Sequence, residues 1–549
     1  MAKLLLDKTK YGWWKSAVFY QIYPKSFLDT TGTGVGDLQG IISKLDYLEK
    51  LGVDGIGLSS VFSSPQSDNG YDVADYYDID PMIGSMQDME ELIARARERE
   101  ISVILDLVLS CGSDRHSWFM EAMKGEENPY HNYYIWRSGT PDRVPNDVRA
   151  ACGGPAWTWV PEVGKWYFHR VSSSQPDLNW ENPSLRQEFY KVIRFWVDKG
   201  IGGFRLDGIN RIAKDPDRMT AIDGPKLHTY LQELSREAFS EAGLISAGKV
   251  WRADTEQAGQ SGEADDGGLS MVFRCDHMEL DRGPGSEKWD MIPLQLTKLK
   301  ECFRRRQQEP QGMSWDSLFM NDHDLPRIVS RWGNDREYRV ESAQMLATML
   351  YGMRGTPWIY QGEELGMTNA ALPIEAYVDP ETLNVYKERI DQGYEAEDVL
   401  RSIHGCSCDN ARTPMQWTAG ENAGFTTGNP WIAVNPNYTA VNADTAMADR
   451  HSMYNFYRHL LRLRKEYNVF RDGSFELWDA DNEKVFSYTR DSADEHLLVV
   501  CNFSADTMMY EIPARFWDSD MLINNYSWDS FDLRPYEAAI FYYNDHKLI

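Results

Sequence analysis

The chain has 549 residues, of which 42% are hydrophobic and 13% aromatic, enough apolar mass for large cores in two or three domains. Lys and Arg number 57 against 84 Asp and Glu, and the formal net charge is −27. Because such a charge repels phosphate backbones and anionic lipids, we expect neither nucleic acid nor a membrane as a partner.

Targeting and cysteine patterns also narrow the class of protein. The apolar run at Leu4–Leu6 is too short for the core of a signal peptide, and no later run reaches 18 apolar residues. Seven cysteines, an odd number in a chain of this size, do not predict a disulfide framework. Cys406 and Cys408 are too isolated to predict a zinc site. We therefore expect a cytoplasmic protein.

The first ~360 residues alternate apolar runs with stretches of helical periodicity, which is typical of βα units in a parallel sheet. No GxGxxG turn, the signal of an open dinucleotide-binding sheet, follows the first run. The fold class is therefore predicted as α/β, a (β/α)8 TIM barrel with outer helices. Helical patterns include residues 87–98, 183–198 and 338–352, and the eight candidate strands are 18–23, 53–61, 101–109, 201–209, 244–250, 271–273, 318–321 and 356–361.

Two segments depart from this alternation. From residue 110 to 175 Trp, Pro, Gly and Asn dominate a stretch too long for an ordinary barrel loop, which predicts a small inserted domain B after strand 3. After about residue 470, short strands separated by turns predict a C-terminal antiparallel β-sandwich, joined to the barrel by a helix over 444–463. The predicted division is 1–109 and 176–470 for the barrel, 110–175 for the inserted domain and 471–549 for the C-terminal domain.

A glycine-rich run, Gly202–Asn210, places a charged pair near the tip of the fourth strand. Arg205 and Asp207 are two residues apart, so their side chains share one face of the strand. Polar groups at the carboxyl end of a barrel strand point into the mouth where substrates bind. Asp207 is then a catalytic carboxylate that Arg205 holds ionised, or the two form a structural pair; this run alone leaves both open.

Motifs at the other strand tips favour the catalytic interpretation. With the barrel in place, the chain resembles the α-amylase superfamily (glycoside hydrolase family 13) through nearly its whole length. Two further motifs are similar to the branch that holds oligo-1,6-glucosidases, α-glucosidases and sucrose isomerases. The superfamily motifs are Gln21–Pro24, Asp68–Asp72, Gly203–Asp207 and Asn321–Asp324, and the branch motifs are Gln175–Asn179 and Asp409–Trp417.

The resemblance implies retaining cleavage of α-glucosidic bonds. Asp207 would be the nucleophile, and Asp324 with His323 would hold the ring hydroxyls and help to distort the ring. This chemistry needs a carboxylate that forms a glycosyl–enzyme intermediate and a second carboxyl group about 5–5.5 Å away that protonates the leaving oxygen. We therefore expect a small carbohydrate as the ligand.

The same resemblance assigns the residues that bind the nonreducing glucose. Asp72, its neighbour Tyr71 and Arg412 would contact the sugar, and Arg205 would tune the nucleophile. The alternative for Asp72 is that of a solvated turn residue.

The acid/base position departs from the family pattern. The fifth strand of the family ends in a Gly-Glu pair whose glutamate is the acid/base, and this chain has Lys249 after Gly248. A lysine, with a pKa near 10.4, is about six units less acidic than a glutamic acid, and loss of general acid catalysis costs roughly 10²–10⁴ in rate. Beside Asp207 the lysine is expected to form an ion pair. The nearest glutamate, Glu256, is expected on a loop beyond the strand tip.

Other pocket positions depart as well. Where the family has a histidine that bonds a sugar hydroxyl after the third strand, this chain has Cys111, and two aromatic positions that wall the glucose read Cys152 and Val171. The residue after the nucleophile, valine in the α-1,6-specific branch, is Gly208. These changes predict a remodelled pocket.

The segment Asp29–Asp37 resembles the calcium loop of the family. Two oxygen ligands, usually Asn and Asp, read Thr31 and Thr33, which leaves only Asp29 and Asp37 charged. Because calcium takes six to eight oxygens with carboxylates among them, we expect no bound metal and no other cofactor.

Three functions follow from these features. The first is a pseudoenzyme on an α-glucosidase scaffold, with little or no hydrolysis, which binds a sugar, another ligand or a protein partner. The second is an active retaining α-glucosidase or transglucosidase on short α-glucosides with a rearranged acid. The third is a non-catalytic structural subunit. The lysine at position 249 favours the first.

Overall fold

The computed structural model describes residues 6–218, 224–240, 243–251, 268–283, 288–309, 315–526 and 532–548. Eight parallel strands form one sheet in the order β11-β10-β9-β5-β2-β1-β13-β12, and a single parallel bridge between Val272 and Asp316 joins its two edges. The predicted (β/α)8 barrel is confirmed. Its strands are β1 (Phe19–Ile22), β2 (Gly55–Leu58), β5 (Ser102–Val108), β9 (Gly203–Asp207), β10 (Ile245–Val250), β11 (Met271–Arg274), β12 (Ser317–Leu318) and β13 (Thr356–Tyr360).

Helices surround the barrel, and their starts follow from local sequence. Ser85 and Asp88 form a capping box at the start of α3, and Asn182 caps α5, which has a proline in its first turn. The barrel helices are α1 (Leu38–Ser43), α2 (Leu45–Leu51), α3 (Met86–Glu98), α5 (Pro183–Asp198), α6 (Leu227–Ala238), α8 (Leu296–Gln307), α9 (Ile328–Trp332) and α10 (Arg339–Tyr351).

The predicted inserted segment between β5 and α5 has its own small sheet and core. Strands β6 (Trp136–Ser138), β8 (Lys165–Phe168) and β7 (Trp157–Val160) pair antiparallel in that order, preceded by α4 (Ser117–Ala122). Trp157, Trp166 and Phe168 are buried in a separate cluster.

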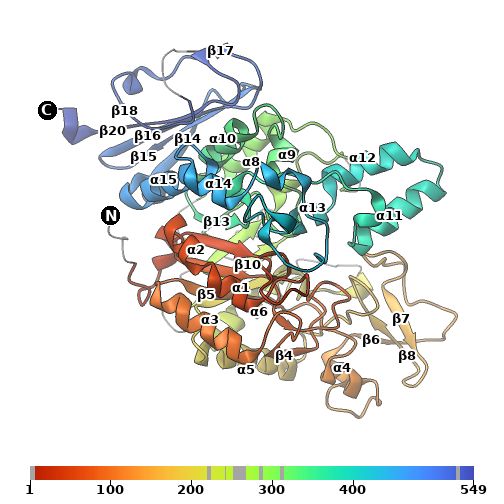
Figure 1. The fold of residues 1–549 in the computed structure, drawn as a ribbon. Coiled ribbons are helices and arrows are strands. Elements are labelled where there is room, and N and C mark those ends of the chain that lie inside the picture. The colour runs from red at the N-terminus through yellow and green to blue at the C-terminus, as the bar shows by residue number, and fades with distance from the viewer. Residues whose placement is uncertain are drawn as a thin grey trace.

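A second excursion, α11 (Pro380–Asp391) and α12 (Ala396–Cys406), lies on the same side of the barrel as β6–β8 (Figure 1). Asn384 of α11 donates to the carbonyl of Cys152, which joins the two excursions. The short α13 (Asp409–Arg412) follows and carries Arg412 back towards the barrel.

The C-terminal sheet lies at the opposite end of the molecule from β6–β8 (Figure 1). Its strand order, β14-β15-β16-β20-β18, confirms the predicted antiparallel domain, with β17 and β19 as a second, two-stranded sheet. Helices α14 (Ala443–Ala448), α15 (Met453–Glu466) and α16 (Val469–Asp472) precede it. The strands are β14 (Ser474–Trp478), β15 (Val485–Asp491), β16 (Glu495–Asn502), β17 (Met508–Met509), β18 (Asp520–Asn524), β19 (Asp532–Leu533) and β20 (Ala538–Asn544).

No helix within the described ranges is both long and apolar enough to cross a membrane.

Candidate active site

The polar side chains of the site come from the carboxyl ends of the barrel strands. Asp207 ends β9, Lys249 is next to last in β10, and Asp322 and Asp324 follow β12. Because the barrel strands are parallel, these residues meet at one mouth, where TIM barrels bind substrates. The sequence-based expectation that the charged groups share one face of the barrel is thus met by the geometry.

Lys249 forms two ion pairs, and neither involves Asp207. Its Nζ lies 2.7 Å from Asp322 Oδ2 and 2.7 Å from Asp324 Oδ2, and its side chain is 0% exposed. The ammonium also lies 4.9 Å from the centre of the Trp251 ring. Burial alone lowers the pKa of Lys249, but the two aspartates outweigh burial and raise the pKa far above its usual value. The expected Lys249–Asp207 pair is replaced by a bridge between two other carboxylates, and the lysine is a fixed cation.

Asp207 is half-buried at the end of β9. Within the described part of the chain, its carboxylate has no hydrogen bond or ion pair. Its charge interacts through space with Arg205 and Tyr71. Gly208, which follows it, has φ +57°, a left-handed conformation that glycine adopts without strain. A carboxylate with unengaged lone pairs can attack a sugar carbon.

Arg205 lies behind the nucleophile instead of bonding to it. Its Nη1 lies 2.6 Å from Asp106 Oδ2 and its Nη2 lies 3.5 Å from Asp322 Oδ2, with the guanidinium fully buried. Tyr71 donates its hydroxyl to the same oxygen of Asp106 at 2.7 Å. Burial raises the pKa of Asp106 to about 6 against the lowering effect of Arg205. Arg205 therefore acts on Asp207 through space, by its charge.

Asp324 is held from three sides. Arg412 Nη2 and His323 Nε2 approach its Oδ1 at 3.4 and 3.3 Å, and Lys249 approaches Oδ2. Burial works against ionisation, but His323, Lys249 and Arg412 together hold the pKa of Asp324 well below its usual range. The carboxylate is 35% exposed and stays charged, which suits a group that binds sugar hydroxyls.

His323 and Arg412 are themselves fixed by neighbours. His323 stacks between Tyr23 and Tyr71, at ring distances of 5.7 and 5.1 Å, and burial lowers its pKa to about 4, so that it is neutral. Arg412 donates to the carbonyl of His323 and pairs with Asp379, the residue that caps α11. The α11 excursion thus helps to position the sugar-binding arginine.

The two carboxylates at the ends of the turn Asp68–Asp72 have different hydrogen-bond partners. Asp72 is fully buried and accepts from Ser64 Oγ and from the backbone N–H groups of Ser67 and Asp68. Asp68 accepts from Gln175 Nε2 at 2.8 Å, and burial, partly offset by Gln175 and Arg412, raises its pKa to about 7. Asp72, predicted to bind glucose, holds the turn, and Asp68 lies beside Arg412 and Asp324. The sequence analysis missed Asp68, although the same motif contains it.

Two of the pocket positions that depart from the family pattern, Cys152 and Val171, are neighbours, and Cys111 lies just after the end of the third barrel strand. Cys111 is buried, and burial raises the pKa of its thiol to about 12, so it stays protonated. The backbone N–H of Cys152 donates to the carbonyl of Val171, which places these two residues side by side at the edge of the inserted segment. Their side chains offer a thiol and a methyl pair where an aromatic ring could stack.

The Asp29–Asp37 loop binds its own hydrogen-bond donors. Asp29 accepts from the N–H groups of Thr31, Gly32 and Gly34 and from two threonine hydroxyls, while Asp37 accepts from Thr30 and caps α1. A cation would have to replace these protons, so the residues present do not fit calcium. No cluster of three or more His, Cys, Asp or Glu side chains suited to a metal occurs among the described residues.

Glu256, the alternative acid, lies outside the described residues.

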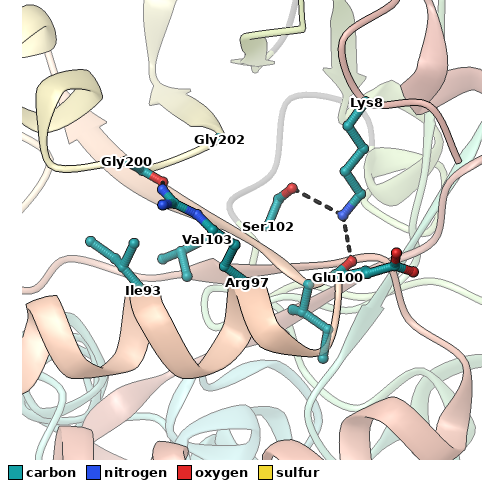
Figure 2. Close-up of a pocket in the computed structure, with 9 residues that line it drawn as sticks. Lys8, Ile93, Arg97, Glu100, Ser102, Val103, Gly200 and Gly202 are labelled. Atoms are coloured by element: carbon teal, nitrogen blue, oxygen red, sulfur yellow. Dashed lines mark hydrogen bonds between the residues drawn. The ribbon is translucent and has the colours of Figure 1, made fainter.

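A cavity of about 200 Å³ lies at the other end of the barrel, at the amino ends of β5 and β9 (Figure 2). There Lys8 donates to Ser102 Oγ and to the carbonyls of Glu100 and Asp54. Because active sites of TIM barrels sit at the carboxyl ends of the strands, this cavity is not the catalytic one.

Comparison with known proteins agrees with the fold. Residues 21–473 match the family model "Alpha amylase, catalytic domain", and residues 475–537 match "Maltogenic Amylase, C-terminal domain". An oligo-1,6-glucosidase of Halalkalibacterium halodurans is 46% identical over 96% of this chain and 98% of its own length. A glucan 1,6-alpha-glucosidase of Streptococcus pneumoniae is 48% identical over 90% and 91%. The crystal structure of trehalose-6-phosphate hydrolase from Bacillus licheniformis has a TM-score of 0.92 at 42% identity, covering 96% and 99%.

These relatives overturn the first of the three functions. The prediction of a pseudoenzyme is wrong, because proteins this similar over almost the whole chain are named as glucosidases and hydrolases. The glutamate replaced by Lys249 is one group of a site in which Asp207 and Asp324 are present, so its loss alone does not predict loss of the reaction. By its family match and its near full-length relatives, the chain belongs to the α-amylase family, glycoside hydrolase family 13.

Proposed function

We propose that the protein is an active retaining α-glucosidase or transglucosidase that acts on short α-glucosides. The observation that carries this proposal is Asp207, a half-buried carboxylate at the mouth of the barrel that is not consumed by an ion pair within the described chain, although Lys249 is close by. A buried lysine that paired with Asp207 would have blocked the nucleophile. Its pairing with Asp322 and Asp324 leaves the nucleophile available.

The site residues divide the work of the reaction. The Asp207 carboxylate attacks the anomeric carbon and forms a glucosyl ester while the bond to the leaving group breaks and that group keeps the electron pair. An acceptor then attacks the same carbon, the ester bond breaks and its electrons return to Asp207, so the configuration is retained. Asp324, with its pKa far below neutral, is the charged acceptor for ring hydroxyls, and Arg412 and Asp68 lie beside it. Arg205, paired with Asp106, keeps positive charge behind Asp207.

The names of relatives support a short α-glucoside as substrate. The similar proteins are named for 1,6-linked oligosaccharides and glucans and for trehalose-6-phosphate. The net charge of −27 repels highly charged polyanions, which favours short substrates over polyanionic ones. We assign no metal, because the carboxylates of the Asp29–Asp37 loop are filled by N–H and O–H donors.

The test is turnover with a trapped intermediate. 4-Nitrophenyl α-glucoside, isomaltose, maltose, sucrose and trehalose-6-phosphate are assayed separately, and the first sugar released is identified by proton NMR. We expect turnover of at least one of them, with the α-anomer formed first. Mass spectrometry of protein quenched during turnover of 5-fluoro-α-glucosyl fluoride should show one added sugar on the peptide that contains Asp207.

Asp207→Asn is the matched control, since it keeps shape and removes the nucleophilic charge. Its activity should fall by at least 10³-fold while its melting temperature stays within a few degrees. No turnover of any donor by the unmodified protein, or a first product with inverted configuration, would refute the proposal.

The seven cysteines support a reducing, cytoplasmic setting. All are free, and all except Cys152 are buried. Disulfides persist in oxidising compartments and are rare in the cytosol. Thiol labelling of unfolded protein taken directly from cells should find seven reactive thiols. Labelling of five, three or only one would indicate one, two or three bridges and an oxidising compartment.

A further inference from the structure

The Lys249 ammonium at the acid/base position determines which leaving groups can depart and which acceptors can attack the anomeric carbon. The Lys249 ammonium is fully buried, lies 2.7 Å from each of two aspartates and packs over Trp251. An ammonium clamped in this way neither gives up a proton to a leaving oxygen nor accepts one from an incoming hydroxyl. In most glycosidases a carboxyl group transfers the proton to the leaving oxygen and from the attacking hydroxyl. Position 249 of this protein therefore has no such proton carrier.

Among the residues that the structure describes, the other carboxyl groups of the site have different partners. Asp322 and Asp324 are held ionised by Lys249, and Asp106 is engaged by Arg205 and Tyr71. Asp68 accepts from Gln175 and lies within range of the charges of Arg412 and Asp324, and no hydrogen bond or ion pair among the described residues joins it to Lys249.

We propose that this site transfers glucosyl units from anionic leaving groups to anionic acceptors. The leaving group departs as an anion that needs no proton. The preferred acceptor is a carboxylate or phosphate oxyanion instead of water or an alcohol. This rests on the proposed function and names its substrate class. The neutral acceptors of ordinary glycosidases must lose a proton as they attack, and an oxyanion has none to lose.

The steps balance without acid or base. A carboxylate oxygen of Asp207 forms a bond to the anomeric carbon while the bond to the leaving group breaks, and that group keeps the electron pair. In the second step a lone pair of the acceptor anion forms a bond to the same carbon, and the ester electrons return to Asp207. No proton moves and nothing is oxidised, and two inversions retain the α-configuration.

The experiment uses the unmodified protein with α-glucosyl fluoride, whose fluoride leaves without a proton. Sodium azide, sodium formate and sodium phosphate are compared with methanol at equal concentration and ionic strength. We expect at least tenfold faster fluoride release with azide and formate, less than twofold with methanol, and α-glucosyl azide as the azide product. With phosphate, α-glucosyl phosphate should form.

A leaving-group series supplies an independent readout on the same protein. For substituted phenyl α-glucosides, kcat/KM should fall roughly tenfold per unit increase in the pKa of the phenol, because the bond breaks without protonation. Between pH 6 and pH 9 the rate with 2,4-dinitrophenyl α-glucoside should change less than threefold.

Variants at position 249 complete the test. Lys249→Arg keeps the cation and should keep the anion preference, whereas Lys249→Glu supplies a proton carrier and should reduce azide acceleration to below twofold. If Lys249→Glu does not fold, as judged by near-ultraviolet circular dichroism, the measurements on the unmodified protein decide.

The outcomes separate the two proposals. Turnover of maltose or isomaltose with equal response to methanol and azide would overturn the anion-transfer inference and leave the proposed function standing. A basic limb near pH 7 that vanishes in Asp68→Asn would also overturn it, by identifying Asp68 as the proton donor. No turnover of any donor, α-glucosyl fluoride included, would overturn the proposed function and this inference with it.

Discussion

At the scale of single residues, the backbone position of Lys249 alone does not determine where its charge lies. The family motif fixes Lys249 on β10, but its four-carbon stem takes the ammonium to Asp322 and Asp324 of a different strand end. A buried ammonium between two carboxylates offsets its own desolvation only while both partners are present.

Removal of that ammonium should therefore be costly. In Lys249→Met, the buried Asp322 loses its nearest cation and the partly exposed Asp324 loses one of two, and we expect a loss of about 3–5 kcal/mol of unfolding free energy. Urea unfolding measures it. Lys226→Met is the control, because its pair with Glu181 is exposed on both sides and should be worth less than about 1 kcal/mol. Equal losses in the two variants would contradict the buried bridge.

A second residue-scale prediction concerns Glu364. Its Oε1 accepts from the Tyr20 and Tyr47 hydroxyls, its Oε2 is buried without a hydrogen bond in the described chain, and burial raises its pKa to about 7. Because this value lies above the unfolded value of 4.5, the stability it contributes is complete below pH 4.5 and is lost as pH rises through about 7.

The test is Glu364→Gln, which cannot ionise. Between pH 6 and pH 8 the unmodified protein should lose on the order of 1 kcal/mol relative to this variant, measured by urea unfolding at each pH. The exposed Glu421→Gln should show the same pH dependence as the unmodified protein. A variant that weakens in parallel with the unmodified protein would mean that Glu364 is ionised throughout this range.

At the scale of elements, alternating patterns were enough to predict all eight barrel strands, each within a few residues of its observed bounds. Apolar runs between helical stretches carry that information because both faces of a barrel strand are buried. The pattern is weaker in the C-terminal sheet, where the apolar run of β18 is only three residues long and lies between Asp520 and Asn524. The pattern also could not predict that Asp72 bonds within its own turn while Asp68 bonds to Gln175, because hydrogen bonding in a turn depends on partners distant in sequence.

Paired variants in that turn distinguish the two carboxylates. Asp72→Asn loses a carboxylate that accepts two backbone N–H groups and a hydroxyl, so we expect a loss of about 1–3 kcal/mol with a small change in KM. Asp68→Asn keeps an acceptor for Gln175 and removes charge beside Arg412, so KM for a glucoside should rise roughly tenfold at nearly unchanged stability. Steady-state kinetics and thermal melting check both; the reverse assignment of effects would contradict the geometry.

The loop Asp29–Asp37 gives a prediction about metal. Its carboxylates are filled by backbone N–H and hydroxyl donors, so bound calcium would have no free oxygens to gain. Melting temperatures in 5 mM calcium chloride and in 5 mM EGTA should therefore agree within about 1 °C. A rise of several degrees in calcium would show a site that binds the folded state.

At the scale of the whole molecule, the barrel and the C-terminal sheet share one core. The main buried cluster runs from Trp13 to Tyr542, and Arg490 of β15, fully buried, donates to the carbonyls of Gly352, Phe470 and Gly473. Tyr488 donates to the carbonyl of Met349 at the end of α10. Composition predicted separate domains but could not predict this continuity, which depends on long-range packing.

We expect the two parts to unfold together. Tryptophan fluorescence, which reports mainly on the barrel, and the near-ultraviolet signal should give coincident urea transitions. Arg490→Met should lower the common midpoint, because its buried carbonyl acceptors lose their donor. Two separated transitions would show that the C-terminal sheet is an independent unit.

The bridge of Lys249 between two aspartates also constrains how this protein can change by mutation. Lysine and glutamate codons differ by a single base, so a return to the acid of the family is close in genetic distance. In the present site a glutamate would meet Asp322 and Asp324, three like charges with no ammonium among them. We therefore expect that laboratory selection for a glutamate at position 249 recovers it only with companion changes at Asp322 or its neighbours.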